Sequence, residues 1–141
     1  MQHPFKQPPE RFNFAQHILE TNRGRAGKPA YIDDRETLSY GDLDQRVRRF
    51  AAGLLALGLR PEERVLVIMH DTTDMPVALL GAMYAGIVPV PVNTLLPAPD
   101  YAYMLGHCGA RVVLASAALL PVVQEAIAQS GRKPQLVVSG D

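Results

Sequence analysis

Residues 80–93, with the sequence LGAMYAGIVPVPVN, constrain the fold more than any other part of the chain. Small and apolar residues lead to Gly86, and glycine readily adopts the left-handed conformation that ends many helices. Valine then alternates with proline from 88 to 92, and β-branched residues favour strands. The run therefore predicts a helix end, a tight turn and a buried strand in close succession.

A regular order of elements surrounds this run. Residues 65–69 are all apolar, which is typical of a strand buried on both faces of a parallel sheet. Helices are expected at 77–85, 100–107 and 117–129, and further strands at 88–92, 111–115 and 136–138. Such alternation is typical of right-handed crossovers. It predicts the α/β class, with a doubly wound, mostly parallel sheet flanked by helices.

The N-terminal part predicts a different arrangement. Residues 1–11 contain three prolines and no apolar period, so we expect an extended proline-rich arm. Residues 12–22 predict a short amphipathic helix capped by Asn13, and residues 30–32 and 37–39 a small hairpin. Ser39 and Asp42 resemble a capping box. They precede a helix whose apolar stripe consists of Leu43, Val47, Phe50, Leu54 and Leu57.

Composition excludes several functions. Fourteen basic residues balance fourteen acidic ones, so no net charge favours nucleic acid or an anionic membrane surface. No apolar run approaches the roughly 20 residues that span a bilayer, and the first residues do not resemble a signal peptide. We therefore expect a cytoplasmic protein. Cys108 is the single cysteine, so no internal disulfide forms, and a packing role is preferred to a redox role.

Polar residues that follow the predicted strands are the candidates for chemistry, because ligands of doubly wound sheets bind beyond the carboxyl ends of the strands. The segments concerned are 70–74, 93–99 and Ser116. His70 and Asp71 could serve in proton transfer or anion binding. The preferred interpretation is that His70 lies in a loop and that one of the next four residues caps the following helix. Those four are Asp71, Thr72, Thr73 and Asp74.

Other polar residues favour structural roles. Asn93 and Thr94 are interpreted as turn residues rather than ligand contacts. His107 precedes Gly109 near a helix end, where a positive charge complements the helix dipole. Arg46, Arg48 and Arg49 are interpreted as a solvated helix face, and His3 and His17 lack metal-ligand spacing.

Phosphate-binding signatures are absent from the sequence, which contains neither GxxxxGK[ST] nor GxGxxG. The same residues form no convincing pair of carboxylates, no nucleophile with its base and no metal cluster. No residue is therefore assigned as catalytic, cofactor-binding or metal-binding. A nucleotide-binding domain that functions alone is disfavoured for the same reason.

Two segments resemble motifs of a known superfamily. Residues 38–43, LSYGDL, are similar to the first core motif of the adenylate-forming enzymes, and residues 80–92 to the second. This superfamily comprises acyl-CoA synthetases, adenylation domains of peptide synthetases and luciferases. Longer stretches at 12–34, 69–105 and 110–116 resemble the family of benzoate-CoA and hydroxybenzoate-CoA ligases.

The resemblance implies an aryl-CoA ligase that joins an aryl carboxylate to ATP and then transfers the acyl group from the adenylate to coenzyme A, with Mg²⁺. In that family the phosphate loop, the aryl pocket and the catalytic lysine lie downstream of the matched region. Residues 12–141 are therefore expected to be a partial N-terminal domain that is inactive and binds no cofactor by itself. Its exposed apolar surface would make it self-associate or pack on the remainder of the ligase. The alternative is a free-standing α/β binding module derived from such a ligase.

Overall fold

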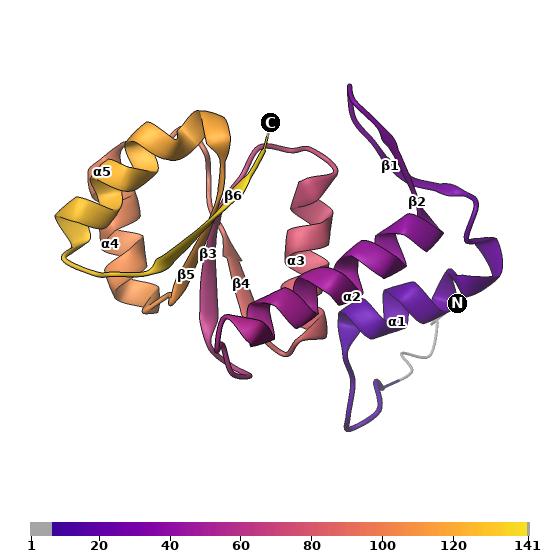
Figure 1. Cartoon of the computed structure of the whole chain (residues 1–141). Helices are drawn as coiled ribbons and strands as arrows, with labels where there is room; N and C mark the ends of the chain where they lie inside the picture. Colours follow the sequence, from indigo (N-terminus) through magenta and orange to yellow (C-terminus); the bar gives the residue numbers. More distant parts are fainter. Residues whose placement is uncertain (1–6, 141) are drawn as a thin grey trace, which may run out of the picture.

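The computed structural model describes residues 7–140, which form a parallel sheet between two layers of helices, next to a small hairpin (Figure 1). The strands of the parallel sheet lie in the order β4-β3-β5-β6, and β1 pairs with β2 in antiparallel orientation. This confirms the predicted doubly wound sheet and hairpin. The strands are β1 (Pro29–Ile32), β2 (Thr37–Ser39), β3 (Arg64–Ile68), β4 (Val88–Pro91), β5 (Val112–Ser116) and β6 (Gln135–Ser139).

Helices connect these strands at the predicted places. The longer ones are α1 (Phe14–Thr21), α2 (Tyr40–Ala56), α3 (Asp74–Tyr84), α4 (Ala98–Cys108) and α5 (Leu120–Ser130). Short 3-10 turns occupy Arg23–Arg25 and Ala117–Leu119. Residues 7–11 contain neither helix nor strand, whereas residues 1–6 lie outside the described part, so the extended arm stays a prediction. Among the described residues, no helix combines the length and apolar character needed to cross a membrane.

Successive side chains of β3 point to opposite faces of the sheet and build two cores. Val65 and Val67 pack towards α2 and α3, whereas Leu66 and Ile68 pack towards α4 and α5. All four are at most 1% exposed. A strand with this two-sided burial needs apolar residues at every position, which explains the uninterrupted apolar run in the sequence.

The edge strand β4 differs from the prediction, which placed a buried strand there. Val88 is 39% exposed, and Val90 is half-buried. Val88 N–H donates to the Glu63 carbonyl and Val92 N–H to the Val67 carbonyl, so even-numbered residues of β4 bond to β3. The nitrogen atoms of Pro89 and Pro91 face the other side, where the described residues add no further strand. Proline suits that side because it has no N–H to leave unpaired.

The turn between α3 and β4 agrees with the prediction. Gly86 has a φ of 75°, in the left-handed region where glycine has little steric cost. Ile87 N–H donates to the Ala82 carbonyl across the turn. The strand therefore begins two residues after the helix-ending glycine.

Asn13 connects the start of α1 to the end of α3. Its side-chain oxygen accepts from Gln16 N–H at 3.0 Å, which confirms the predicted cap. The amide nitrogen of the same side chain donates to the carbonyls of Met83 at 2.9 Å and Tyr84 at 3.3 Å. One side chain thus satisfies backbone groups at the ends of two helices.

The start of α2 contains the predicted capping box. Asp42 N–H donates to the Ser39 hydroxyl at 3.1 Å, and Ser39 N–H donates to the Asp42 carboxylate at 3.3 Å. Leu43, Val47 and Leu54 of the predicted stripe are buried, while Leu57 at the end is 37% exposed. The helix therefore packs along most of its apolar face.

Gly81 allows α3 to approach α2 closely. A β-carbon at this position would lie 2.7 Å from Phe50 Cδ1 and 3.1 Å from Phe50 Cβ, closer than side chains normally pack. Gly53 of α2 is also helical, but no atom lies within 4 Å of the corresponding position. The two glycines therefore have different structural roles.

Replacing these glycines tests the helix contact. We expect Gly81→Ala to lower the free energy of unfolding by about 1–3 kcal/mol, because Phe50 is displaced from a close-packed position. Gly53→Ala should raise the free energy of unfolding by about 0.5–1 kcal/mol, because alanine favours the helix. Urea unfolding followed by circular dichroism measures both, and equal effects would contradict the proposed contact.

Substitutions of Asn13 test the link between α1 and α3. Asn13→Ala should lower the free energy of unfolding by about 1–2 kcal/mol, since it removes the cap and the two bonds to α3. Asn13→Asp retains the capping oxygen but puts a carboxylate oxygen, which cannot donate, against the Met83 and Tyr84 carbonyls. An aspartate variant that unfolds like the native chain would show that the bonds to α3 contribute nothing.

Candidate functional site

The strand order changes direction between β3 and β5. From β3 the chain passes through α3 to β4 on one side, and then through α4 to β5 on the other side. Ligands of doubly wound sheets bind beyond the carboxyl ends of strands at this point. The segments that meet there are residues 69–73 after β3 and the Ala117–Leu119 turn after β5.

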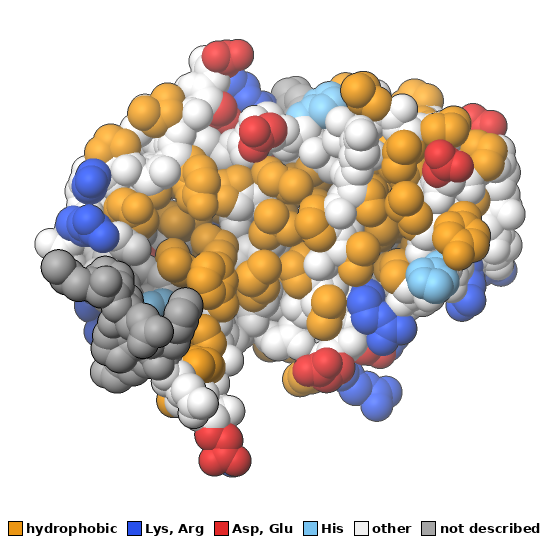
Figure 2. All heavy atoms as spheres, turned by 180° about the vertical axis from the view of Figure 1, so that it is seen from behind, with side chains coloured by type: hydrophobic (Ala, Val, Ile, Leu, Met, Phe, Trp, Pro, Cys, Tyr) orange, Lys and Arg blue, Asp and Glu red, His pale blue; other side chains and the backbone are white. Residues whose placement is uncertain are grey.

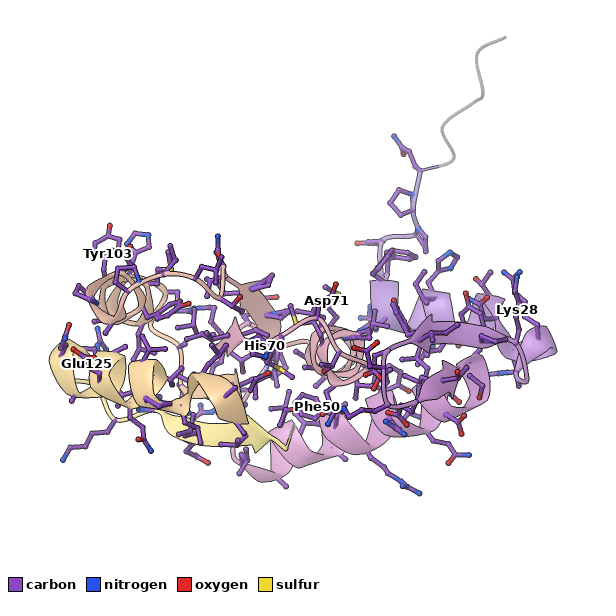
Figure 3. All side chains as sticks on the ribbon, turned by 90° about the horizontal axis from the view of Figure 1, so that it is seen from above. Lys28, Phe50, His70, Asp71, Tyr103 and Glu125 are labelled. Carbon is purple, nitrogen blue, oxygen red and sulfur yellow. The ribbon has the colours of Figure 1, made fainter. Side chains whose placement is uncertain are left out.

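His70 and Asp71 lie on the first of these segments (Figure 3). His70 N–H donates to the hydroxyl of the fully buried Ser116 at 2.9 Å, so Ser116 joins the two loops. His70 is half-buried and Asp71 is exposed. Together with Arg35 and Ala118 they line an open depression of about 420 Å³. The structure therefore brings the predicted residues of two segments together at the expected end of the sheet.

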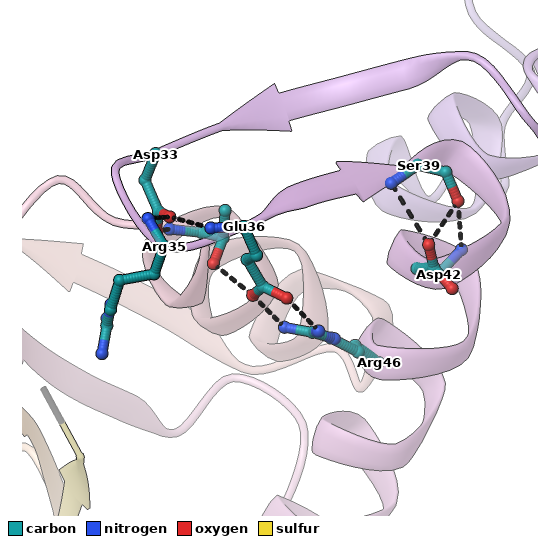
Figure 4. A network of polar contacts seen from close by, with 7 residues as sticks. Asp33, Arg35, Glu36, Ser39, Asp42 and Arg46 are labelled. Carbon is teal, nitrogen blue, oxygen red and sulfur yellow. Dashed lines mark hydrogen bonds and ion pairs between the residues drawn. The ribbon is translucent and has the colours of Figure 1, made fainter.

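Carboxylates of the β1–β2 hairpin occupy the N-terminus of α3 (Figure 4). Thr73 N–H donates to the Asp33 carboxylate at 2.9 Å, and the Thr73 hydroxyl donates to Glu36 Oε1 at 2.7 Å. The N-terminus of a helix attracts anions because its N–H groups are unpaired and its dipole is positive there. The chain itself supplies one such anion, because the Asp33 carboxylate accepts from the N–H at the N-cap position.

The predicted cap of α3 was right in its position and wrong in its side-chain bond. Thr73 occupies the N-cap position, but its side chain makes no capping bond, because the hydroxyl is directed to Glu36. Asp33, forty positions earlier, bonds the backbone instead. Asp74 has another role, since its carboxylate accepts from the Ser139 hydroxyl at 2.5 Å and links α3 to β6.

Arg46 belongs to the same network, although its side chain is 39% exposed and so also lies on the predicted solvated face. Its two terminal nitrogens bond the two carboxylate oxygens of Glu36, both at 2.6 Å. Arg46 is half-buried, whereas Arg48 and Arg49 are exposed as predicted. Arg48 pairs with Asp44 at 2.8 Å and donates to the Tyr84 hydroxyl at 2.6 Å. The ion pair of Arg46 was not predicted, because helix periodicity does not reveal the neighbouring hairpin.

The network shifts the acidity of both hairpin carboxylates. Hydrogen bonds from the backbone N–H groups of Thr73, Glu36 and Arg35 hold the pKa of Asp33 far below its usual range. Hydrogen bonds from the Arg46 guanidinium and then from the Thr73 hydroxyl lower the pKa of Glu36. Both groups are therefore stabilised as carboxylates, as expected for groups with a structural role in the folded state.

Asn93 acts in the turn after β4, as predicted. Its side-chain oxygen accepts from Leu95 N–H at 2.8 Å, an arrangement typical of asparagine turns. Its carbonyl accepts from the hydroxyl of Tyr101 at 2.7 Å, and Tyr101 is 1% exposed. The segment after β4 is thus held to α4 by its own polar groups.

Two other histidines and the cysteine lie on α1 and α4, apart from the switch point. His107 is stacked on Tyr103, with ring centroids 5.5 Å apart, and His17 lies beside Phe12 at 5.3 Å. The helix end at Gly109 is left-handed with a φ of 62°. Cys108 is half-buried against the core under α4, which agrees with a packing role. His3 is outside the described residues.

Neither a metal-ligand cluster nor a phosphate loop is identified among residues 7–140. Within residues 7–140, no group of three or more His, Cys, Asp and Glu residues is placed to hold a metal ion. The sequence contains no glycine-rich phosphate loop, and carboxylates fill the helix end at the switch point. We therefore assign no residue of this chain to Mg²⁺ or to ATP.

Acid should weaken the contact between the hairpin and α3. Because the pKa of Asp33 is lowered by folding, its stabilising effect is present above the unfolded-state value of about 3.9 and is lost as the pH falls towards the folded-state value. Asp33→Asn should therefore destabilise the chain at pH 7 and reduce the fall in unfolding free energy below about pH 4. Asp34→Asn, which removes the same charge from the exposed neighbour, is the control. Urea unfolding across this pH range measures both, and identical pH profiles for the two variants would contradict the assignment.

A profile of the AMP-binding enzymes matches residues 18–141. The chain is 42% identical to the benzoate-CoA ligase of Thauera aromatica over 135 residues, which is 94% of this chain and 26% of the relative. It is 41% identical to the 4-hydroxybenzoate-CoA/benzoate-CoA ligase of Rhodopseudomonas palustris over 92% of this chain and 24% of the relative. The chain therefore spans about a quarter of the length of these relatives.

Solved structures agree with the sequence matches. A benzoate CoA ligase from Burkholderia xenovorans LB400 superposes with a TM-score of 0.89 and 53% identity, over 92% of this chain and 26% of that chain. An anthranilate CoA ligase in complex with anthranoyl-AMP has a TM-score of 0.88 at 29% identity, with 94% of this chain and 26% of that chain covered. The matched regions are N-terminal parts of adenylate-forming ligases. With most of its length matched by the family profile, the chain belongs to the AMP-binding enzymes.

Proposed function

We propose that the chain is the N-terminal part of an ATP-dependent aryl-CoA ligase whose acid is benzoate. The observation that carries this proposal is the 53% identity to the benzoate CoA ligase from Burkholderia over 92% of the chain. The 42% identity to the Thauera benzoate-CoA ligase supports it. The identity is lower, at 32%, to the 3-hydroxybenzoate-CoA ligase of Aromatoleum.

The reaction has two steps, each of which forms one bond and breaks another. A carboxylate oxygen of benzoate attacks the α-phosphorus of ATP, which releases diphosphate and gives benzoyl-adenylate. The thiol of coenzyme A loses its proton, and its sulfur then attacks the benzoyl carbon, which releases AMP. Adenylation is needed because a carboxylate resists attack by a thiol, whereas AMP is a good leaving group.

The contribution of this chain is structural. The parallel sheet is covered by helices on both faces, and the N-terminus of α3 is bonded to the hairpin, so the chain forms a scaffold. We expect the chain by itself to be inactive. ATP, coenzyme A and Mg²⁺ would be bound by the longer enzyme, in the cytoplasm. Apolar side chains spread over the face shown in Figure 2, which supports the proposal that the chain packs against other protein.

A product assay tests the proposal. The longest polypeptide of the source reading frame is incubated with ATP, coenzyme A, Mg²⁺ and either benzoate, 3-hydroxybenzoate, 4-hydroxybenzoate or anthranilate. We expect benzoyl-CoA and AMP, with the highest kcat/KM for benzoate. The 141-residue chain alone should show no benzoate-dependent exchange between ATP and diphosphate.

The outcomes separate the parts of this proposal. If another aryl acid gives a higher kcat/KM than benzoate, that acid is the preferred substrate. The assignment of the enzyme as an aryl-CoA ligase would then still hold. Failure to form any aroyl-CoA would contradict the ligase, and a reading frame that yields only this chain would favour the binding module. Exchange by the 141-residue chain would contradict its expected inactivity.

A further inference from the structure

The outer side of α4 has an exposed stripe of three side chains. Asp100, Tyr103 and His107 are spaced by three and four positions, so they lie along one side of the helix. Asp100 and His107 are exposed, and Tyr103 is 69% exposed. The ring of Tyr103 points away from the sheet (Figure 3), and the imidazole of His107 is stacked on it. The stripe therefore has an aromatic centre, a carboxylate at one end and an imidazole at the other.

Exposed apolar residues flank this stripe. Val90 of β4 packs into the core under α4, and Val88 lies on the same face of the sheet because strand side chains alternate. Val88 is 39% exposed, and Leu95, in the turn before α4, is 88% exposed. We define the α4 face as Val88, Leu95, Asp100, Tyr103 and His107. Exposed apolar side chains of this size are typical of protein contacts.

The neighbouring edge of the sheet limits how a partner can approach. The nitrogen atoms of Pro89 and Pro91 are directed outward from β4 and have no hydrogen to donate. A partner on this side would therefore pack its side chains against the α4 face and would not add a strand to the sheet. Tyrosine is enriched in contacts of this kind, because it combines a large apolar ring with a polar tip.

The charges of the stripe complement a second copy of the same stripe. A two-fold axis between Tyr103 and Met104 would be equally far along the helix from Asp100 and from His107. In an antiparallel pair of α4 helices about this axis, Asp100 of each copy lies opposite His107 of the other. The carboxylate can accept a hydrogen bond from the imidazole, and the Tyr103 side chains meet at the axis. Antiparallel packing also places opposite ends of the helix dipoles together.

We propose that the α4 face is a two-fold contact between two copies of the chain, centred on Tyr103. The choice of partner rests on the charge pattern, because a two-fold contact requires a surface that complements itself. Asp100 and His107 meet this requirement about a single axis, and Tyr103, Leu95 and Val88 provide the apolar area. The proposal goes beyond the ligase reaction and does not depend on which aryl acid is used.

Two variants of Tyr103 test the apolar centre of the contact. Sedimentation velocity over a range of concentrations gives the dissociation constant of the dimer. Tyr103→Glu should raise this constant about tenfold or more, because it brings two carboxylates together at the axis. Tyr103→Phe retains the ring and should change the constant by about twofold or less. Circular dichroism establishes that each variant folds, as expected for an exposed position.

Charge reversal tests the antiparallel arrangement. Asp100→Lys places two donors opposite each other, and His107→Glu places two carboxylates opposite each other, so each should raise the dissociation constant about tenfold. An equimolar mixture of the two variants should restore the dimer. In that mixed pair the new lysine faces the new glutamate, while the unchanged Asp100 faces the unchanged His107. Within one chain these positions are about 10 Å apart along the helix, so restoration requires contact between copies.

The longest polypeptide of the source reading frame provides the decisive comparison. We expect it to form a dimer that Tyr103→Glu dissociates. A monomeric longer polypeptide would show that other parts of the ligase cover the α4 face, and it would overturn the proposal. A native chain that stays monomeric, equal constants for the native chain and Tyr103→Glu, or a mixture that fails to restore the dimer would also overturn it. None of these outcomes depends on benzoyl-CoA formation, so failure of the ligase assignment remains distinguishable.

Discussion

The two-sided burial of β3 and β5 is the constraint on which the rest of the structure depends. Every residue of β5 is buried, and so are the four apolar residues of β3. A sheet with two apolar faces needs a layer of helices on each, and right-handed crossovers supply them in turn. Once β3 and β5 are paired, α2 and α3 cover one face and α4 and α5 the other (Figure 1).

The hairpin network determines what the switch point can do. Asp33 and Glu36 provide the α3 N-terminus with two carboxylates, and Arg46 balances part of their charge. An arrangement that binds phosphate in many α/β proteins is here used to attach the hairpin to the domain.

Local patterns predicted the elements, and long-range contacts limited what could be predicted about the site. The apolar run of β3 and the Ser39–Asp42 capping box depend on neighbours in sequence, and both were confirmed. The exposure of β4 was missed because valine predicts a strand but not its place in the sheet. The bond from Thr73 to Asp33 spans forty positions, and no periodicity reports it. The polar residues 70–74 did lie at the switch point, but their partners were recognisable only in three dimensions.

Asn13 has a consequence for the order in which the chain can fold during synthesis. Its amide donates to carbonyls 70 and 71 positions later, so α1 cannot complete its attachment until Tyr84 has left the ribosome. The apolar residues of α1, Ala15 and Leu19, share a core with Val77 and Leu80 and must wait equally long. The first helix to be made is thus fixed in place only after α3 has been made, and until then its apolar side is open to chaperones and to other nascent chains.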